Sequence, residues 1–259
     1  YYQQVVKAPS ATNENMEFGS AIHHALQKLF DKMMEFNNEF PSMDIFIGDF
    51  RWYMHRHRDK FTKDGLKRKL EYGSILLENY YAHNIQSWSK IVLVERFFNG
   101  VLVDGIPLKG KIDKIEFNGN TCNVVDYKTG KVNYAKTKMS PPTDTNPLGG
   151  DYWRQAVFYK LLVDNYKIKD WTVDKLTFQF IEPDEKGKYV NHEIMVKPED
   201  VDIVREQIKD TWTKIQAHDF YTGCGKKDCA WCNMVKENGH YESLLAREKL
   251  RLEEVTEEE

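Results

Sequence analysis

Apolar residues recur at three- and four-residue spacing in several stretches of the chain, which is the period of a helix with one buried face. Residues 18–36 show this pattern through Ile22, Leu26, Leu29 and Met33. The same reasoning predicts further helices over residues 67–84, 152–165 and 197–218.

Between these stretches the pattern changes to short segments rich in β-branched and aromatic residues, which favour strands. Strands are expected over residues 91–98, 108–117, 122–128 and 175–181, and a loop over 137–150. The order helix, three strands, helix, strand, helix predicts an α/β domain with a central mixed sheet flanked by helices. We expect a single domain over residues 1–240 and a charged helix or disordered tail over 241–259.

The formal net charge of −3 is unevenly distributed along the 259 residues. Residues 242–259 carry seven acidic and three basic side chains, whereas residues 51–70 carry eight Lys or Arg against two Asp. A basic cluster can bind phosphates by releasing counterions, or it can simply be the solvated face of a helix. The candidate contacts to nucleic acid are Arg56, Arg58, Lys67 and Arg68.

The chain shows no secretory signal and no apolar run near the ~18 residues of a membrane span. We therefore expect a cytoplasmic protein without membrane contact. Its first residue is Tyr1 and not Met, which suggests a fragment of a longer protein.

Two carboxylates and a lysine fall on the predicted hairpin formed by residues 108–117 and 122–128. If the hairpin loop is Gly119-Asn120, Asp113 lies directly opposite Asp126; if it is Asn118-Gly119, the two aspartates are diagonal neighbours. Both registers place them on one face of the sheet, whereas a three-residue loop would separate them. Alternation along the strand puts Lys128 on the same face as Asp126.

Two neighbouring carboxylates repel each other, and a divalent cation relieves that repulsion. Mg²⁺ prefers hard oxygen ligands, acidifies a bound water and stabilises charge on a phosphoryl oxygen. Lys128 could orient the attacking hydroxide or stabilise the transition state. The plainer alternative is a surface salt bridge between Asp126 and Lys128.

The order of four motifs along the chain favours the catalytic interpretation. Gly19-Ser-Ala-Ile-His23, Asp113, Asp126-Tyr-Lys-Thr-Gly130 and Gln155-Ala-Val-Phe-Tyr159 follow one another. This series resembles the RecB-type branch of the PD-(D/E)xK nuclease superfamily, which includes the nuclease domains of RecB and AddB helicase-nucleases and the CRISPR-associated exonucleases. The resemblance implies a restriction-endonuclease-like core.

The resemblance also implies a role for each motif residue. His23, Asp113, Asp126 and the backbone carbonyl of Tyr127 would bind Mg²⁺ or Mn²⁺, and Lys128, supported by the two aspartates, would be the catalytic lysine. Gln155 and Tyr159, one helical turn apart, would position the lysine or contact the DNA. Glu95 matches a family glutamate near the site. Each assignment has an ordinary alternative. His23 could be a helix histidine without a ligand, Gln155 and Tyr159 could be surface residues of an amphipathic helix, and the Tyr127 ring could belong to the core.

The resemblance predicts a metal-dependent DNA nuclease, expected to act as an exonuclease in the repair and recombination of DNA ends. Its DNA would be single-stranded or a duplex end, and a helicase motor would belong to the same polypeptide or complex, because the chain has no phosphate-binding Gly-rich loop of its own. A non-catalytic DNA-binding clamp and a stand-alone CRISPR-associated exonuclease are the alternatives.

Three of the four cysteines, Cys224, Cys229 and Cys232, crowd near the C-terminus. Some relatives carry three ligands of an iron–sulfur cluster after the last helix, although the spacing here differs from theirs. Zinc held by these thiolates and His240 is an alternative, and unligated thiols are the plainer one. Disulfides are not expected in a chain without a secretion signal.

Overall fold

The computed structural model describes residues 13–219, 223 and 227–237. The chain divides into two compact units, one formed by Thr12–Gln207 and the other by Tyr1–Ala11 with Ile208–Glu259. All the motif residues named above lie in the first unit. Cys224, His240 and the tail 241–259 lie outside the described residues, so the predictions made for them stay predictions.

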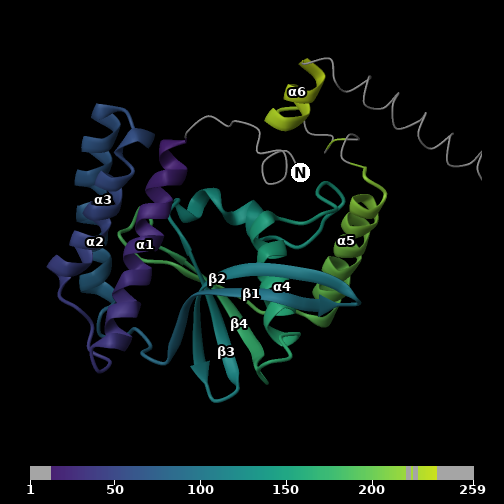
Figure 1. The fold of residues 1–259 in the computed structure, drawn as a ribbon, viewed down its shortest axis with the longest axis horizontal. Helices are drawn as coiled ribbons and strands as arrows, with labels where there is room; N and C mark the ends of the chain where they lie inside the picture. Colours follow the sequence, from purple (N-terminus) through teal and green to yellow (C-terminus); the bar gives the residue numbers. More distant parts are fainter. Residues whose placement is uncertain (1–12, 220–222, 224–226, 238–259) are drawn as a thin grey trace, which may run out of the picture. The chain divides into compact units, whose positions relative to one another are not determined.

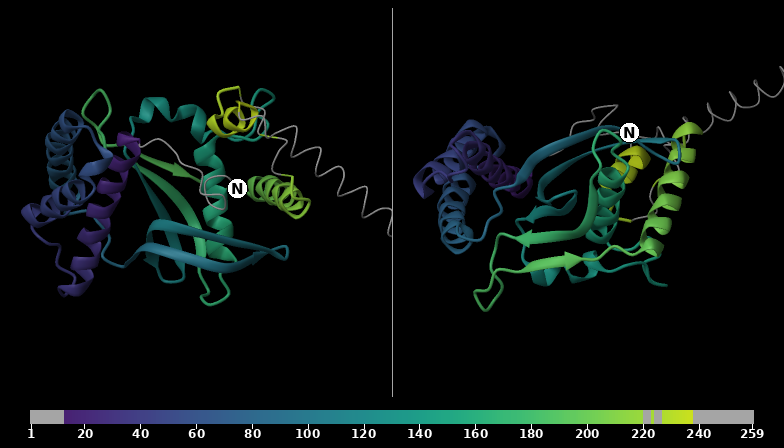
Figure 2. Two further views of the ribbon diagram at one scale, coloured as in Figure 1. Left: turned by 45° about the horizontal axis from the view of Figure 1, so that its top comes forward. Right: turned by 90° about the horizontal axis from the view of Figure 1, so that it is seen from below.

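Three helices pack side by side at the start of the described chain. They are α1 (Glu14–Glu35), α2 (Met43–Arg56) and α3 (Lys63–Asn84), with a short 3-10 helix, η1 (Arg58–Lys60), between the last two. Figure 1 shows them grouped beside the sheet, and both views of Figure 2 keep that grouping. The side chain of Asn13 caps α1 by accepting hydrogen bonds from the amides of Asn15 and Met16, which is the usual role of Asn at this position.

One five-stranded sheet follows, with its strands in the order β1-β2-β3-β4-β5. The strands are β1 (Val92–Val103), β2 (Ile106–Asn118), β3 (Thr121–Lys128), β4 (Thr172–Phe180) and β5 (Asn191–Ile194). The β3–β4 pair is parallel and the other pairs are antiparallel. The predicted α/β architecture with a mixed sheet flanked by helices is therefore confirmed.

Helix α4 (Asp151–Asp164) supplies the crossover that two parallel strands require. Two 3-10 helices, η2 (Val132–Tyr134) and η3 (Lys136–Met139), precede it, and α5 (Pro198–Gln216) and α6 (Ala230–Glu237) follow the sheet. Helix α4 packs on β1, β2 and β4. A hydrophobic core joins α1, α2 and α3 to Val125 and Tyr127 of β3, so the neighbouring side chains of β3 alternate between this core and the face toward α4.

The hairpin register resolves the alternatives left by the sequence. Asn118 pairs with Thr121 and Lys114 with Val125, so the loop is Gly119-Asn120 and the next position brings Asp113 opposite Asp126. Gly119 has a φ of 63°, which is left-handed and accounts for the glycine.

Candidate active site

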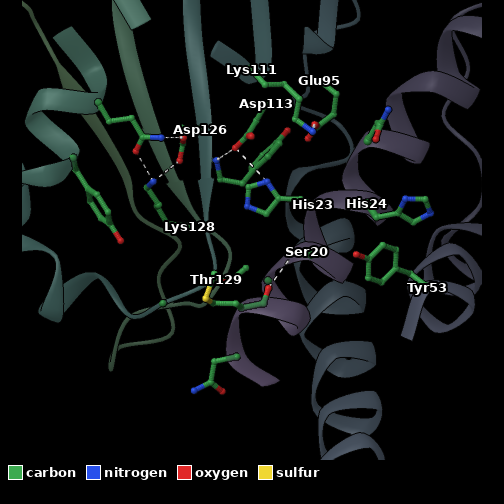
Figure 3. A pocket seen from close by; sticks show the side chains of 18 of the residues that line it. Ser20, His23, His24, Tyr53, Glu95, Lys111, Asp113, Asp126, Lys128 and Thr129 are labelled. Carbon is green, nitrogen blue, oxygen red and sulfur yellow. Dashed lines mark hydrogen bonds and ion pairs between the residues drawn. The ribbon is translucent and has the colours of Figure 1, made fainter. Parts of the chain in front are cut away.

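The motif residues converge on a cavity of about 1050 Å³ between α1, α4, the middle of β2 and the end of β3. Helix α1 contributes His23, β1 contributes Glu95, and α4 contributes Gln155 and Tyr159. Figure 3 shows the carboxylates of Asp113 and Asp126 directed into this space from adjacent strands. Segments far apart in the sequence therefore share one site.

Two glycines, Gly19 and Gly110, lie where helices approach the strands closely. A Cβ on Gly19 would lie 3.3 Å from Oγ1 of Thr129, which is tight contact between α1 and the end of β3. A Cβ on Gly110 would lie 2.5 Å from Cδ1 of Leu162 in α4, so a side chain there would force that leucine to move. These close approaches account for glycine at both positions.

Asp113 links α1 to β3. Its Oδ2 lies 3.3 Å from Nδ1 of His23 and accepts a hydrogen bond of 2.9 Å from the backbone amide of Tyr127. Burial disfavours the imidazolium of His23, but the hydrogen bond and charge of Asp113 outweigh burial and, with Asp126 and Glu95, raise the His23 pKa above its usual value. The imidazole of His23 therefore lies in a strongly negative electrostatic environment.

Glu95 completes a group of three ligand atoms. Among the described residues, His23, Glu95 and Asp113 offer one nitrogen and two carboxylate oxygens that all lie within 4.8 Å of one another. Glu95 adopts a left-handed φ of 49° inside β1, a conformation that is uncommon for a residue with a side chain and is concentrated at functional sites. The ammonium of Lys111 pairs with the Glu95 carboxylate.

Asp126 and Lys128 form the buried half of the site. Lys128 Nζ lies 2.7 Å from Asp126 Oδ2 and donates a hydrogen bond of 2.8 Å to Gln155 Oε1. Desolvation raises the pKa of Asp126 to about 6, the charge of Asp113 adds to the rise, and the Lys128 ammonium opposes it. The usual pKa of an aspartate is near 3.8. The ionised form of Asp126 is therefore destabilised in the folded protein.

Helix α4 braces this pair. Gln155 Nε2 donates to Asp126 Oδ1 at 2.9 Å and to the Tyr159 hydroxyl at 2.7 Å, and that hydroxyl donates to the same Oδ1 at 3.2 Å. An ammonium can only donate hydrogen bonds, so the Gln155 atom that faces Lys128 is the amide oxygen. The amide nitrogen of Gln155 then faces Asp126. Gln155 and Tyr159 therefore orient both the carboxylate and the lysine.

Two residues of the site were absent from the sequence-based candidates. The Lys128 ammonium lies 4.2 Å from the ring centroid of Tyr152, one helical turn before Gln155, and 5.0 Å from that of Phe178. Lys111 stands two positions before Asp113 in β2. Periodicity could have identified both residues. Tyr152 lies one helical turn before Gln155, and Lys111 lies on the same strand face as Asp113.

The four basic candidates do not line this cavity. Arg56 is at the end of α2, Arg58 is in η1, and Lys67 and Arg68 are on α3, all of them exposed. Lys67 borders a separate surface hollow formed by α2 and α3. Tyr127 contributes its ring to the core, with its hydroxyl buried and lacking a hydrogen-bond partner.

The sequence matches the PD-(D/E)XK nuclease superfamily over residues 1–236. The chain belongs to this superfamily, whose members are nucleases.

No curated protein sequence matches the chain. Among solved structures, a "Putative exonuclease" from Eubacterium rectale aligns with a TM-score of 0.45 and 12% identity over 76% of this chain and 75% of its own. The protein SSO0001 aligns with a TM-score of 0.28 and 14% identity over the same shares of the two chains. No helix in the described part of the chain is long and apolar enough to cross a membrane.

Proposed function

We propose that this chain is a metal-dependent deoxyribonuclease that hydrolyses phosphodiester bonds from DNA ends, as the nuclease part of an ATP-dependent helicase-nuclease in DNA repair. The observation that carries the proposal is one cavity in which Lys128 and Asp126, braced by Gln155, lie beside the cluster of His23 and Asp113. A clamp that only binds DNA has no use for a lysine held against a buried carboxylate.

The residues of the cavity fit a hard divalent cation. Asp126 Oδ2 is buried and faces the Lys128 ammonium at 2.7 Å. Glu95 and Asp113 line the same cavity and bring two more carboxylates, and the imidazole of His23 can supply a nitrogen ligand once it is deprotonated. Carboxylate oxygens with one imidazole suit Mg²⁺ or Mn²⁺.

His23, Asp113, Asp126 and the carbonyl of Tyr127 would hold the cation, with Glu95 as a further ligand. The Tyr127 amide already points toward Asp113, and in a strand the carbonyl of a residue points to the same side as its amide. When bound, the cation acidifies water and neutralises charge that develops on the phosphoryl oxygens.

The chain's own residues supply orientation and charge. Lys128 carries a fixed positive charge toward the cavity, where it can orient the attacking water and stabilise the extra negative charge of the transition state. Gln155 and Tyr159 hold the lysine and Asp126 in one arrangement before the DNA arrives. Such prior positioning lowers the reorganisation that the reaction requires.

The test is cleavage of linear and covalently closed circular single-stranded DNA by the same preparation, with Mg²⁺, with Mn²⁺ and with EDTA. Metal-dependent loss of the linear substrate, with the circle intact, is the expected result for an exonuclease. Cleavage of both the linear and the circular substrate would show that the protein acts as an endonuclease. Binding of DNA by the folded protein without cleavage in either metal would favour the clamp.

The helicase attachment rests on the resemblance to RecB and AddB. Helicase motifs encoded upstream of Tyr1 would support it, whereas a reading frame that begins near Tyr1 would favour a stand-alone exonuclease.

A further inference from the structure

Four aromatic side chains lie in contact along α1 and α2, beginning at the catalytic cavity. The ring of His24 stacks on Trp52, with centroids 5.6 Å apart and planes 25° apart, and lies 5.0 Å from the Tyr53 ring. Tyr53 in turn stacks on His57 at 4.1 Å and 7°. His24 and Tyr53 line the cavity, and Figure 3 shows them beside each other next to His23.

Trp52 is the exposed member of this series. It is 55% accessible, whereas Phe46 and Phe50 of the same helix are fully buried in the core. A single exposed apolar residue needs no explanation, but this one is connected to the cavity through His24. The guanidinium of Arg56 lies 5.6 Å from its ring centroid, so one face of the indole already carries a cation.

The charges around these rings favour a polyanion. Arg56 and Arg58 are exposed on the same segment. The nearby acidic groups are engaged: Asp49 pairs with Lys32, Asp59 pairs with Lys60, and Glu17 accepts from Tyr53 and lies 3.1 Å from Nδ1 of His57.

Stacked rings beside positive charge fit unpaired bases on a phosphate backbone. Bases stack on aromatic side chains with little dependence on sequence, whereas a duplex keeps the faces of its bases inside. We propose that His24 and Trp52, with Arg56, form a stacking platform that binds single-stranded DNA and leads it to Lys128. This proposal rests on the nuclease function proposed above and names single-stranded DNA as its substrate.

The platform is tested by binding in EDTA, where no cleavage interferes. The probes are a fluorescent oligothymidylate of about 12 nucleotides, within the ~4–16 nucleotides that one such surface covers, an abasic strand of the same length, and a duplex. The variants of the full chain are Trp52→Ala, Trp52→Phe and, as a matched control, Phe36→Ala, which removes an equally exposed ring beyond the end of α1.

Trp52→Ala is expected to weaken binding of oligothymidylate by about five- to a hundredfold, the range for loss of one stacked base, and to leave the abasic strand unaffected. Trp52→Phe should retain most of the affinity, and Phe36→Ala all of it. Unchanged oligothymidylate binding by Trp52→Ala overturns the platform, and so does an equal loss for the abasic strand.

This outcome is separable from that of the nuclease proposal. Wild-type protein that binds oligothymidylate no better than the duplex overturns the platform whatever the cleavage assay shows. Protein that binds through Trp52 but never cleaves supports the platform, and only the nuclease activity then fails.

Discussion

Glu95 stands directly opposite Asp113 in the register of β1 on β2, because Val94 pairs with Lys114 and Arg96 with Ile112 on either side of them. The left-handed φ of Glu95 interrupts the ladder at this point. Since Asp113 in turn stands opposite Asp126, three acidic residues occupy one row across three strands. Such a row is electrostatically unfavourable without cations, and each acid has one nearby: Lys111, His23 and Lys128.

A divalent cation is therefore expected to stabilise the fold. At about a hundredfold excess over its dissociation constant, binding adds ~2.7 kcal/mol, which for a domain of this size raises Tm by about 5–10 °C. Differential scanning fluorimetry with Mg²⁺ or Mn²⁺ against EDTA measures the shift. Glu95→Gln and Asp113→Asn should reduce it, and Glu39→Gln, at an exposed position that does not line the cavity, should not. An equal shift in all variants would contradict the assigned ligands.

Asp126→Asn is expected to stabilise the metal-free protein while abolishing cleavage. The folded protein keeps the Asp126 proton up to a pH of about 6, whereas the unfolded chain releases it near 3.8. Folding therefore takes up a proton between these pH values, and stability falls as the pH rises through them. Asn resembles the protonated acid and avoids this loss, which is on the order of 1–3 kcal/mol.

The check is urea unfolding in EDTA. The stability of Asp126→Asn relative to wild type should grow from about pH 4 to pH 6 and then level off. A variant that is less stable than wild type at pH 7 would show that the ion pair with Lys128 outweighs desolvation.

Tyr152 is expected to position Lys128 through the face of its ring, since the ammonium lies 4.2 Å from the centroid. Tyr152→Leu should lower kcat by about three- to thirtyfold, the equivalent of ~0.5–2 kcal/mol, and should leave KM nearly unchanged. Tyr152→Phe keeps the ring and should restore kcat. If Phe impairs cleavage as much as Leu does, the hydroxyl and not the ring is the functional group.

Much of the fold was predictable because the site lies on regular elements. The periodicity of α1 and the alternation of β3 placed His23 and Lys128 correctly relative to their neighbours. The turn residues left two two-residue loops and one three-residue loop open for the register of Asp113, and the structure has the first of these. Helix α2 was not predicted, although Phe46, Phe50 and Met54 repeat at helical spacing, because exposed apolar and basic side chains such as Ile45, Trp52 and Arg56 interrupt the amphipathic pattern. Strand β5 has a single buried residue, Ile194, and leaves no pattern to detect.

The rest depends on tertiary contacts that no local pattern encodes. The convergence of Glu95 on His23 requires the irregular backbone of β1, and the stacking of His24 on Trp52 requires the packing of two helices. The basic residues Arg56, Arg58, Lys67 and Arg68 share a stretch of sequence, but they are distributed over three helical segments.

The central claim is that Lys128 and the acidic row carry out metal-dependent cleavage of DNA. The most direct measurement is single-turnover cleavage of end-labelled linear single-stranded DNA in Mg²⁺, in Mn²⁺ and in EDTA, with Lys128→Ala beside the wild type. The account predicts cleavage by the wild type only with metal, and a loss of at least about a hundredfold in the variant, whose melting curve shows that it is folded. Cleavage by Lys128→Ala at the wild-type rate would contradict it.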